Sequence, residues 1–166
     1  MGKRAAISVD EYLHTAFPDL DKEYLDGEIV ERGLPDNLHS TTQALLISFF
    51  MALRKTLKVY PRPELRLRVR DRLYFIADVS IIHPDAPTEA VRSSPPFIVI
   101  EILSTDDRMS KVRAKLEEYR AWEVPHVWLV DPNSKRMYQC ENGLAEVPTL
   151  RVPELSLEVR SEDIFE

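Results

Sequence analysis

The sequence predicts a mixed α/β fold, in which a mixed β-sheet is flanked by helices and preceded by an N-terminal β-hairpin. Three observations lead to this prediction. Apolar residues recur at helical spacing in segments 37–57 and 108–122. Apolar and basic residues alternate along segment 64–71, as in a strand with one buried face. Segment 97–103 is apolar almost without alternation, which is typical of a strand covered on both faces. Helices packed on a sheet around a shared core are the architecture that fits these elements.

The N-terminal region predicts a short helix followed by the hairpin. Ser8 and Glu11 have the spacing of a capping box, so we expect a helix over about residues 9–17. Further on, Asp26 and Gly27 stand between two short β-prone runs. An Asp-Gly pair in that position favours a type I′ turn, because both central residues of this turn need a positive φ.

The central region predicts a long helix and then a pair of strands. Asn37 and Ser40 are candidate N-caps for a helix that continues to about Leu57. Segments 64–71 and 74–82 follow as strands. Since only a short connection separates them, we expect these two strands to pair antiparallel.

The C-terminal half predicts strands around one further helix. After a proline-rich loop, segment 97–103 is expected to be a buried strand and segment 108–122 a helix. Segment 126–131 is expected to be another buried strand, and a turn leads into a strand over 136–139. For the last 26 residues we expect one strand near 155–159 and a tail that covers a sheet edge.

Composition narrows the class of protein. The 166 residues include 22 Lys+Arg, 28 Asp+Glu and 44% hydrophobic residues, which is enough for one domain over residues 1–166 with its own core. A single cysteine, Cys140, excludes zinc fingers, iron–sulfur sites and disulfide scaffolds. The longest apolar run, 97–100, is too short to span a membrane, and the N-terminus does not resemble a signal peptide. We therefore expect a cytoplasmic protein that has no membrane partner.

The net charge of −6 is unevenly distributed. Segment 54–72 contains eight bases and two acids, so the rest of the chain is strongly acidic. Arg66, Arg68 and Arg70 share one face of the predicted strand. They could follow the phosphates of a nucleic acid. A sheltered sheet edge or a dimer contact would explain them equally.

Two carboxylates interrupt the apolar strands. Glu101 lies inside the run 97–103, and Asp78 lies inside the predicted neighbouring strand. A buried carboxylate costs several kcal/mol unless it is paired or binds a cation. The two acids could bind a hard divalent cation such as Mg²⁺, or each could form a buried salt bridge. Lys115 lies at the edge of its helix's apolar stripe, from which it could reach the sheet or extend to solvent.

The chain also resembles a known family, and the order and spacing of several short features carry that resemblance. They are Glu101-Ile-Leu-Ser104, Lys115, Tyr119 and the segment Val124-Pro125-His-Val-Trp128-Leu-Val-Asp131-Pro132. The match also takes in Tyr24 to Val30, His39 and Ala77-Asp78-Val79. Over about residues 20–132, the chain is similar to a bacterial family of restriction-endonuclease-like proteins, long catalogued as a domain of unknown function. That family belongs to the PD-(D/E)xK nuclease superfamily.

The resemblance implies a metal-dependent active site. Asp78 resembles the aspartate of the PD element, and Glu101 resembles the acidic residue of the (D/E)xK element. Leu103 occupies the usual lysine position, and Lys115 resembles the substitute lysine on the following helix. By this resemblance Asp78, Glu101 and the backbone carbonyl of Ile102 would hold Mg²⁺ or Mn²⁺, while Lys115 would orient the attacking water.

Further expectations follow for other residues and for function. His39 could touch phosphate or orient a water, or could serve as a cap or packing residue, and Glu28 is a weaker candidate that could simply face solvent. Tyr119 and Trp128 are expected in the core. The preferred hypothesis is a nuclease that acts on DNA, with a homodimer as the expected assembly. The alternatives are a catalytically weak nuclease-fold module that binds nucleic acid or another partner, and a small-molecule phosphoesterase.

Overall fold

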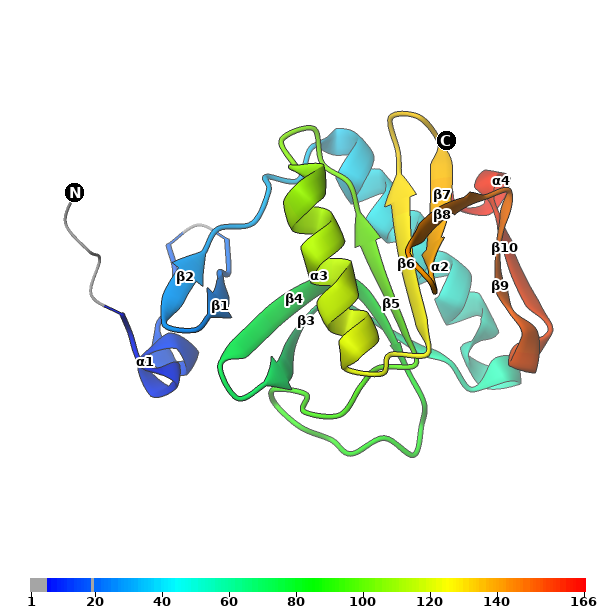
Figure 1. Cartoon of the computed structure of the whole chain (residues 1–166). Helices are drawn as coiled ribbons and strands as arrows, with labels where there is room; N and C mark the ends of the chain where they lie inside the picture. The colour runs from blue at the N-terminus through cyan, green and yellow to red at the C-terminus, as the bar shows by residue number, and fades with distance from the viewer. Residues whose placement is uncertain (1–5, 19) are drawn as a thin grey trace.

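A computed structural model of the chain describes residues 6–18 and 20–166, which form an eight-stranded mixed sheet, a two-stranded sheet and the helices around them (Figure 1). The long helix α2 (Asn37–Leu57) packs on one face of the large sheet, and α3 (Met109–Ala121) packs on the other. The predicted fold class, a mixed sheet flanked by helices, is therefore confirmed. None of the helices in these described ranges is long and apolar enough to cross a membrane.

The N-terminal helix α1 (Val9–His14) begins at the predicted capping box. The Ser8 side chain accepts a hydrogen bond from the Glu11 backbone, and the Glu11 carboxylate accepts one from the Ser8 backbone. The helix ends three residues before the predicted end at 17, because Thr15 adopts an extended backbone conformation. Sequence periodicity defines such a boundary poorly.

The predicted hairpin is formed by β1 (Glu23–Leu25) and β2 (Glu28–Val30). Asp26 and Gly27, at its turn, have φ values of 49° and 105°. Both values are positive, as a type I′ turn requires. The hairpin joins the large sheet through β1, whose Tyr24 pairs with Tyr74.

The central helix and strand pair are also present, with corrections at their starts. Asp36 caps α2 by accepting a hydrogen bond from the His39 amide at 2.9 Å, so neither Asn37 nor Ser40 is the cap. Strands β3 (Tyr60–Arg70) and β4 (Leu73–Ile82) pair antiparallel, as predicted. Strand β3 begins earlier than expected and includes two prolines, which an edge strand tolerates because one side of its backbone needs no partner.

Strand β5 (Ile98–Ile102) pairs with β4 on one side and runs parallel to β6 (His126–Asp131) on the other. Helix α3 connects these two parallel strands. Strands β7 (Arg136–Cys140) and β8 (Leu144–Val147) extend the sheet antiparallel. Strand β8 was not predicted.

One edge of β4 is shared by two strands and leaves an opening between them. Strand β3 covers the opposite edge over almost the whole length of β4. On the shared edge, β1 pairs with Leu73 and Tyr74, whereas β5 pairs with residues 79–81. Residues 75–78 of β4 therefore face a gap in the sheet, and this gap positions the candidate site.

The C-terminal segment is more structured than the predicted single strand and tail. Strands β9 (Thr149–Val152) and β10 (Leu157–Arg160) form the two-stranded sheet, with the 3-10 turn η1 (Pro153–Leu155) between them. Helix α4 (Ser161–Ile164) follows. The expected strand near 155–159 corresponds to β10, and β9 was missed. The segment's buried apolar side chains join the core on the α2 side; they are Leu150, Val152, Leu157, Val159, Ile164 and Phe165.

Candidate active site

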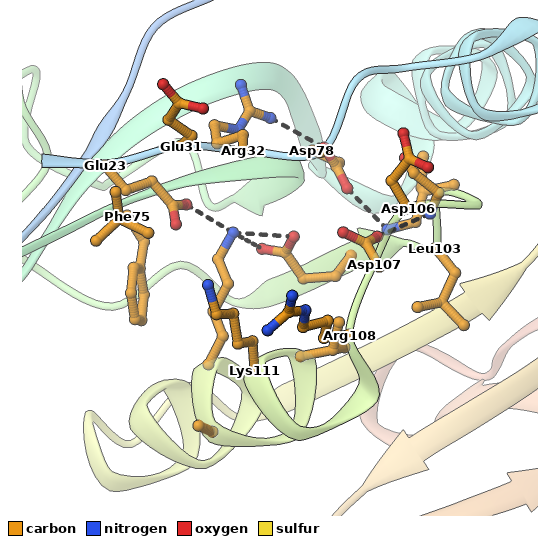
Figure 2. A pocket seen from close by; sticks show the side chains of 18 of the residues that line it. Glu23, Glu31, Arg32, Phe75, Asp78, Leu103, Asp106, Asp107, Arg108 and Lys111 are labelled. Atoms are coloured by element: carbon orange, nitrogen blue, oxygen red, sulfur yellow. Dashed lines mark hydrogen bonds and ion pairs between the residues drawn. The ribbon is translucent and has the colours of Figure 1, made fainter.

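The gap between β1 and β5 opens into a cleft of about 770 Å³ (Figure 2). Its lining comes from the hairpin, the start of α2, strands β4 and β5, and α3. The site residues predicted from sequence that line it are Asp78, Glu101, Ile102, Lys115, His39 and Glu28. Segments far apart in the sequence thus meet in one cavity, whose volume is typical of a small-molecule or substrate site.

Asp78 is 5% exposed and accepts hydrogen bonds from both sides of its carboxylate. Its Oδ2 accepts from the Ile102 amide at 2.8 Å, and its Oδ1 accepts from Arg32 Nη2 at 3.1 Å. His39 Nε2 lies 3.4 Å from Oδ2. Burial alone would raise the pKa of Asp78, but the contact with His39, the charge of Lys115 and the Ile102 amide lower it below its ordinary value. Asp78 is therefore held in its ionised form.

Glu101 is 8% exposed and projects toward α3. The Tyr119 hydroxyl donates to its Oε1 at 2.8 Å, and Lys115 Nζ lies 3.0 Å from the same oxygen. Burial, and then the negative charges of Asp78 and Glu23, raise the pKa of Glu101 to about 8, although Lys115 acts in the opposite direction. Tyr119, expected in the core, is buried and also a direct partner of the site.

Lys115 does reach back from α3 to the sheet. Its Nζ lies 2.7 Å from Glu23 Oε1, donates to Glu101, and donates to the backbone carbonyl of Ile76 at 3.1 Å. Burial opposes the charge on this ammonium, but Glu101 and Glu23 outweigh that effect and raise the pKa of Lys115. Lys115 therefore remains a cation at the centre of the carboxylate cluster.

Two further residues of the site, Glu23 and Arg32, were not predicted from the sequence. Glu23 Oε1 accepts from the Ile76 amide at 2.9 Å, while Arg32 bridges Asp78 and Glu64. Glu23 was hidden because its relevance depends on the pairing of β1 with β4, which no local pattern reveals. The acid that sequence analysis chose from the hairpin, Glu28, is exposed on the outer strand β2 at the rim of the cleft.

His39 is buried beside Asp78 and not exposed at the start of its helix. Burial would lower its pKa, yet the contact with Asp78 outweighs this and raises the pKa of His39. The other ring nitrogen, Nδ1, is buried and has no hydrogen-bond partner among the described residues. His39 is thus placed to orient the Asp78 carboxylate.

The three arginines of the predicted basic face of β3, Arg66, Arg68 and Arg70, are each paired with an acid. Arg66 lies 3.8 Å from Asp21 and stacks over the Tyr12 ring. The two further pairs join Arg68 to Asp71 at 2.8 Å and Arg70 to Asp26 at 3.1 Å. The basic face that the sequence predicted is therefore matched by neighbouring carboxylates.

The donor set of the cleft fits a hard divalent cation. Carboxylate and carbonyl oxygens are the ligands that Mg²⁺ prefers, and one or two carboxylates are enough. Burial raises the pKa of Glu101 to about 8, and the nearby acids Asp78 and Glu23 crowd negative charge there and act in the same direction. A further positive charge would relieve this crowding. Within residues 6–18 and 20–166, no group of three or more His, Cys, Asp or Glu side chains is arranged to hold a metal.

Comparisons with known proteins agree with this fold. The Uma2 family model, whose description is "Putative restriction endonuclease", matches residues 9–166, a longer range than the motif resemblance over about 20–132. One similar solved structure is a "putative nuclease belonging to DUF820" from Anabaena variabilis, with 23% identity, a TM-score of 0.81, and coverage of 95% of this chain and 97% of that chain. No curated protein matched the sequence. The chain belongs to the Uma2 family and has the fold of a restriction-endonuclease-like protein.

Proposed function

We propose that this protein is a divalent-metal-dependent nuclease that hydrolyses phosphodiester bonds in DNA. The observation that carries the proposal is the meeting of Asp78, Glu101 and Lys115 in one cleft, although they come from two strands and a helix. Paired carboxylates are suited to a hard cation, and a lysine beside them supplies positive charge and hydrogen-bond donors. Membership of the Uma2 family supports nuclease activity as the general class.

In this proposal Asp78, Glu101 and the backbone carbonyl of Ile102 hold Mg²⁺ or Mn²⁺. When bound, such an ion lowers the pKa of a coordinated water and offsets the negative charge that develops on the phosphate. The side chains of the protein orient these ligands. Arg32 and His39 orient Asp78 through their contacts with its two carboxylate oxygens.

Glu101 and Lys115 act as a unit in the proposed mechanism. The Tyr119 hydroxyl fixes the direction of the Glu101 carboxylate. Lys115, which stays protonated between Glu23 and Glu101, orients the attacking water and offsets charge on the phosphate. Both contributions depend on a cluster that folding has already assembled, so little reorganisation accompanies the reaction.

A Mn²⁺ titration of the purified protein, followed by calorimetry or spin resonance, tests this proposal without a chosen substrate. We expect saturable binding by the native protein and its loss in Asp78→Ala and in Glu101→Ala. The exposed Glu141, on a turn outside the cleft, supplies the control variant Glu141→Ala, which should bind normally. Binding that persists unchanged in both site variants would contradict the proposal.

A second candidate, a nuclease-fold module that binds nucleic acid and has weak or no catalysis, is favoured by one observation. Protein cations already contact both acids, since Arg32 bonds Asp78 and Lys115 bonds Glu101. For such a module, Mn²⁺ should not bind at the carboxylates, and an oligonucleotide should bind equally well with and without divalent ions. A nuclease should instead cleave plasmid DNA only when Mg²⁺ or Mn²⁺ is present.

A further inference from the structure

The charge of the cleft poses a problem for a nucleic-acid substrate. Eight Asp and Glu residues line the cleft, against four Lys and Arg residues. The excess of negative charge would repel the phosphates of a nucleic-acid strand unless particular Lys or Arg side chains bind them. Two of the four, Arg32 and Lys115, are already held by carboxylates of the cluster.

The other two cations, Arg108 and Lys111, form no ion pair within the described residues. Both side chains are exposed. Neither has an acidic group within ion-pair distance anywhere in residues 6–18 and 20–166. This distinguishes them from Arg66, Arg68 and Arg70 of β3, each of which would have to give up a carboxylate partner in order to bind a phosphate.

The geometry of α3 places these two cations in line with the candidate catalytic lysine. Arg108, Lys111 and Lys115 are separated by three and four residues, so they share one face of the helix. With a rise of 1.5 Å per residue, Lys111 lies about 6 Å and Arg108 about 10 Å from Lys115 along the helix axis. Figure 2 shows the Arg108 and Lys111 side chains rising from the start of α3 into the pocket, on the side facing Asp78.

These spacings suit a single nucleic-acid strand. One strand of a duplex advances about 3.4 Å per nucleotide along its axis, so distances of this size span no more than about three nucleotides. A phosphate at Lys115 would therefore have its neighbours on one side within reach of Lys111 and Arg108. We propose that Arg108 and Lys111 bind the phosphates that flank the reacting bond on the α3 side of the cleft. This inference rests on the proposed nuclease function and names how its substrate is held.

The test measures binding and requires no cleavage. A fluorescently labelled DNA duplex is titrated with protein in the presence of a chelator, and fluorescence anisotropy is recorded over a series of salt concentrations. We expect Arg108→Ala and Lys111→Ala each to weaken binding and to reduce the slope of log K against log salt by about 1. In the double variant, the slope of log K against log salt should be reduced by about 2. Arg113→Ala is the matched control, because Arg113 is exposed on the same helix but does not line the cleft.

Two results would overturn the inference. One is a double variant that keeps the native salt slope, and the other is an Arg113→Ala variant whose salt slope falls as much as that of Arg108→Ala. Thermal melts check that all variants remain folded. Failure of the proposed function has a different signature. In that case the salt slopes would fall as expected, while the native protein would leave DNA intact when Mg²⁺ or Mn²⁺ is added.

Discussion

At the scale of single residues, two similarly buried carboxylates in one cleft have pKa values shifted in opposite directions. Asp78 is 5% exposed and Glu101 is 8% exposed. Burial is the largest influence on each, but the contact with His39, the charge of Lys115 and the hydrogen bond from the Ile102 amide lower the pKa of Asp78. Glu101 lies near two other acids, and its pKa is raised. The number and kind of donors, more than burial itself, determine which carboxylate stays charged.

We predict that neutralising these two acids has unequal effects on stability. Asp78→Asn removes the charge that pairs with Arg32 and His39 and should lower the free energy of unfolding by about 3 kcal/mol, as expected when one partner of a buried ion pair is lost. Glu101→Gln relieves crowding, and Glu23 still pairs with Lys115, so stability should be unchanged or raised. Urea denaturation at pH 7 with a chelator measures both. A larger loss for Glu101→Gln than for Asp78→Asn would contradict this account.

We also predict that the stability of the metal-free protein falls as the pH rises from about 4.5 to about 8. The pKa of Glu101 is near 8 in the folded protein and 4.5 as its ordinary value, so the folded state binds more protons in that interval. Stability therefore decreases with pH there, by an amount on the order of a few kcal/mol. His39, whose pKa is also raised, adds a loss in the same direction above its ordinary value.

Chemical denaturation across this pH range, in the presence of a chelator, measures the slope. Glu101→Gln should flatten it, leaving only the part that His39 contributes. A native protein whose stability is constant or rises between these pH values would show that Glu101 is ionised in the folded state at neutral pH.

At the scale of secondary-structure elements, the gap between β1 and β5 leaves residues 75–78 of β4 without a neighbouring strand on one edge, while β3 pairs with the other edge. Ile76 lies in that interval, and side chains replace the missing strand. Glu23 accepts from its amide, and Lys115 donates to its carbonyl. Glu23 and Lys115, which belong to the site, therefore satisfy the backbone groups of β4 that no strand pairs with on this edge. Strand β4 and the Glu23–Lys115–Glu101 cluster thus stabilise each other.

This arrangement predicts that Glu23 matters for stability and that its neighbour in the hairpin does not. Glu23→Ala leaves the buried Ile76 amide without an acceptor and should destabilise the protein by about 1–3 kcal/mol. Glu28→Ala, on the exposed strand β2, should change stability by less than about 0.5 kcal/mol. The midpoints of urea denaturation of the two variants measure this difference, provided that the dependence of the unfolding free energy on urea concentration is the same in both. Equal midpoints would mean that Ile76 finds another partner.

At the scale of the whole molecule, the C-terminal sheet is part of the core on the α2 side. Leu150, Val152, Val159 and Ile164 are buried in the same cluster as Leu46. We predict that a chain truncated after residue 148 loses its cooperative thermal transition and binds a hydrophobic dye, because the apolar surface under these side chains becomes exposed. A truncated chain that melts cooperatively at the native midpoint would show instead that residues 149–166 form a separate unit.

The sequence by itself determined the elements whose signals are local. Helical periodicity predicted α2 and α3, and an Asp-Gly pair predicted the hairpin turn. Alternation predicted β3, and the short connection that follows it predicted its antiparallel pairing with β4. It also singled out Asp78 and Glu101, because a carboxylate inside an apolar strand needs a compensating partner wherever that strand lies.

Only the tertiary structure decided which partners those carboxylates have. Arg32 and Glu23 come from the hairpin region, which joins the site through the pairing of β1 with β4, a contact between segments about 50 residues apart. Arg32 pairs with Asp78, and Glu23 pairs with Lys115, the partner of Glu101. The predicted arginine face of β3 is matched by acids for the same reason. Strand β9 of the small C-terminal sheet was missed because these short strands are stabilised by burial against α2 and carry little periodicity of their own. Periodicity predicts which face of a helix or strand a side chain lies on. The partners of a buried charge come from other segments of the chain, so only the tertiary structure determines them.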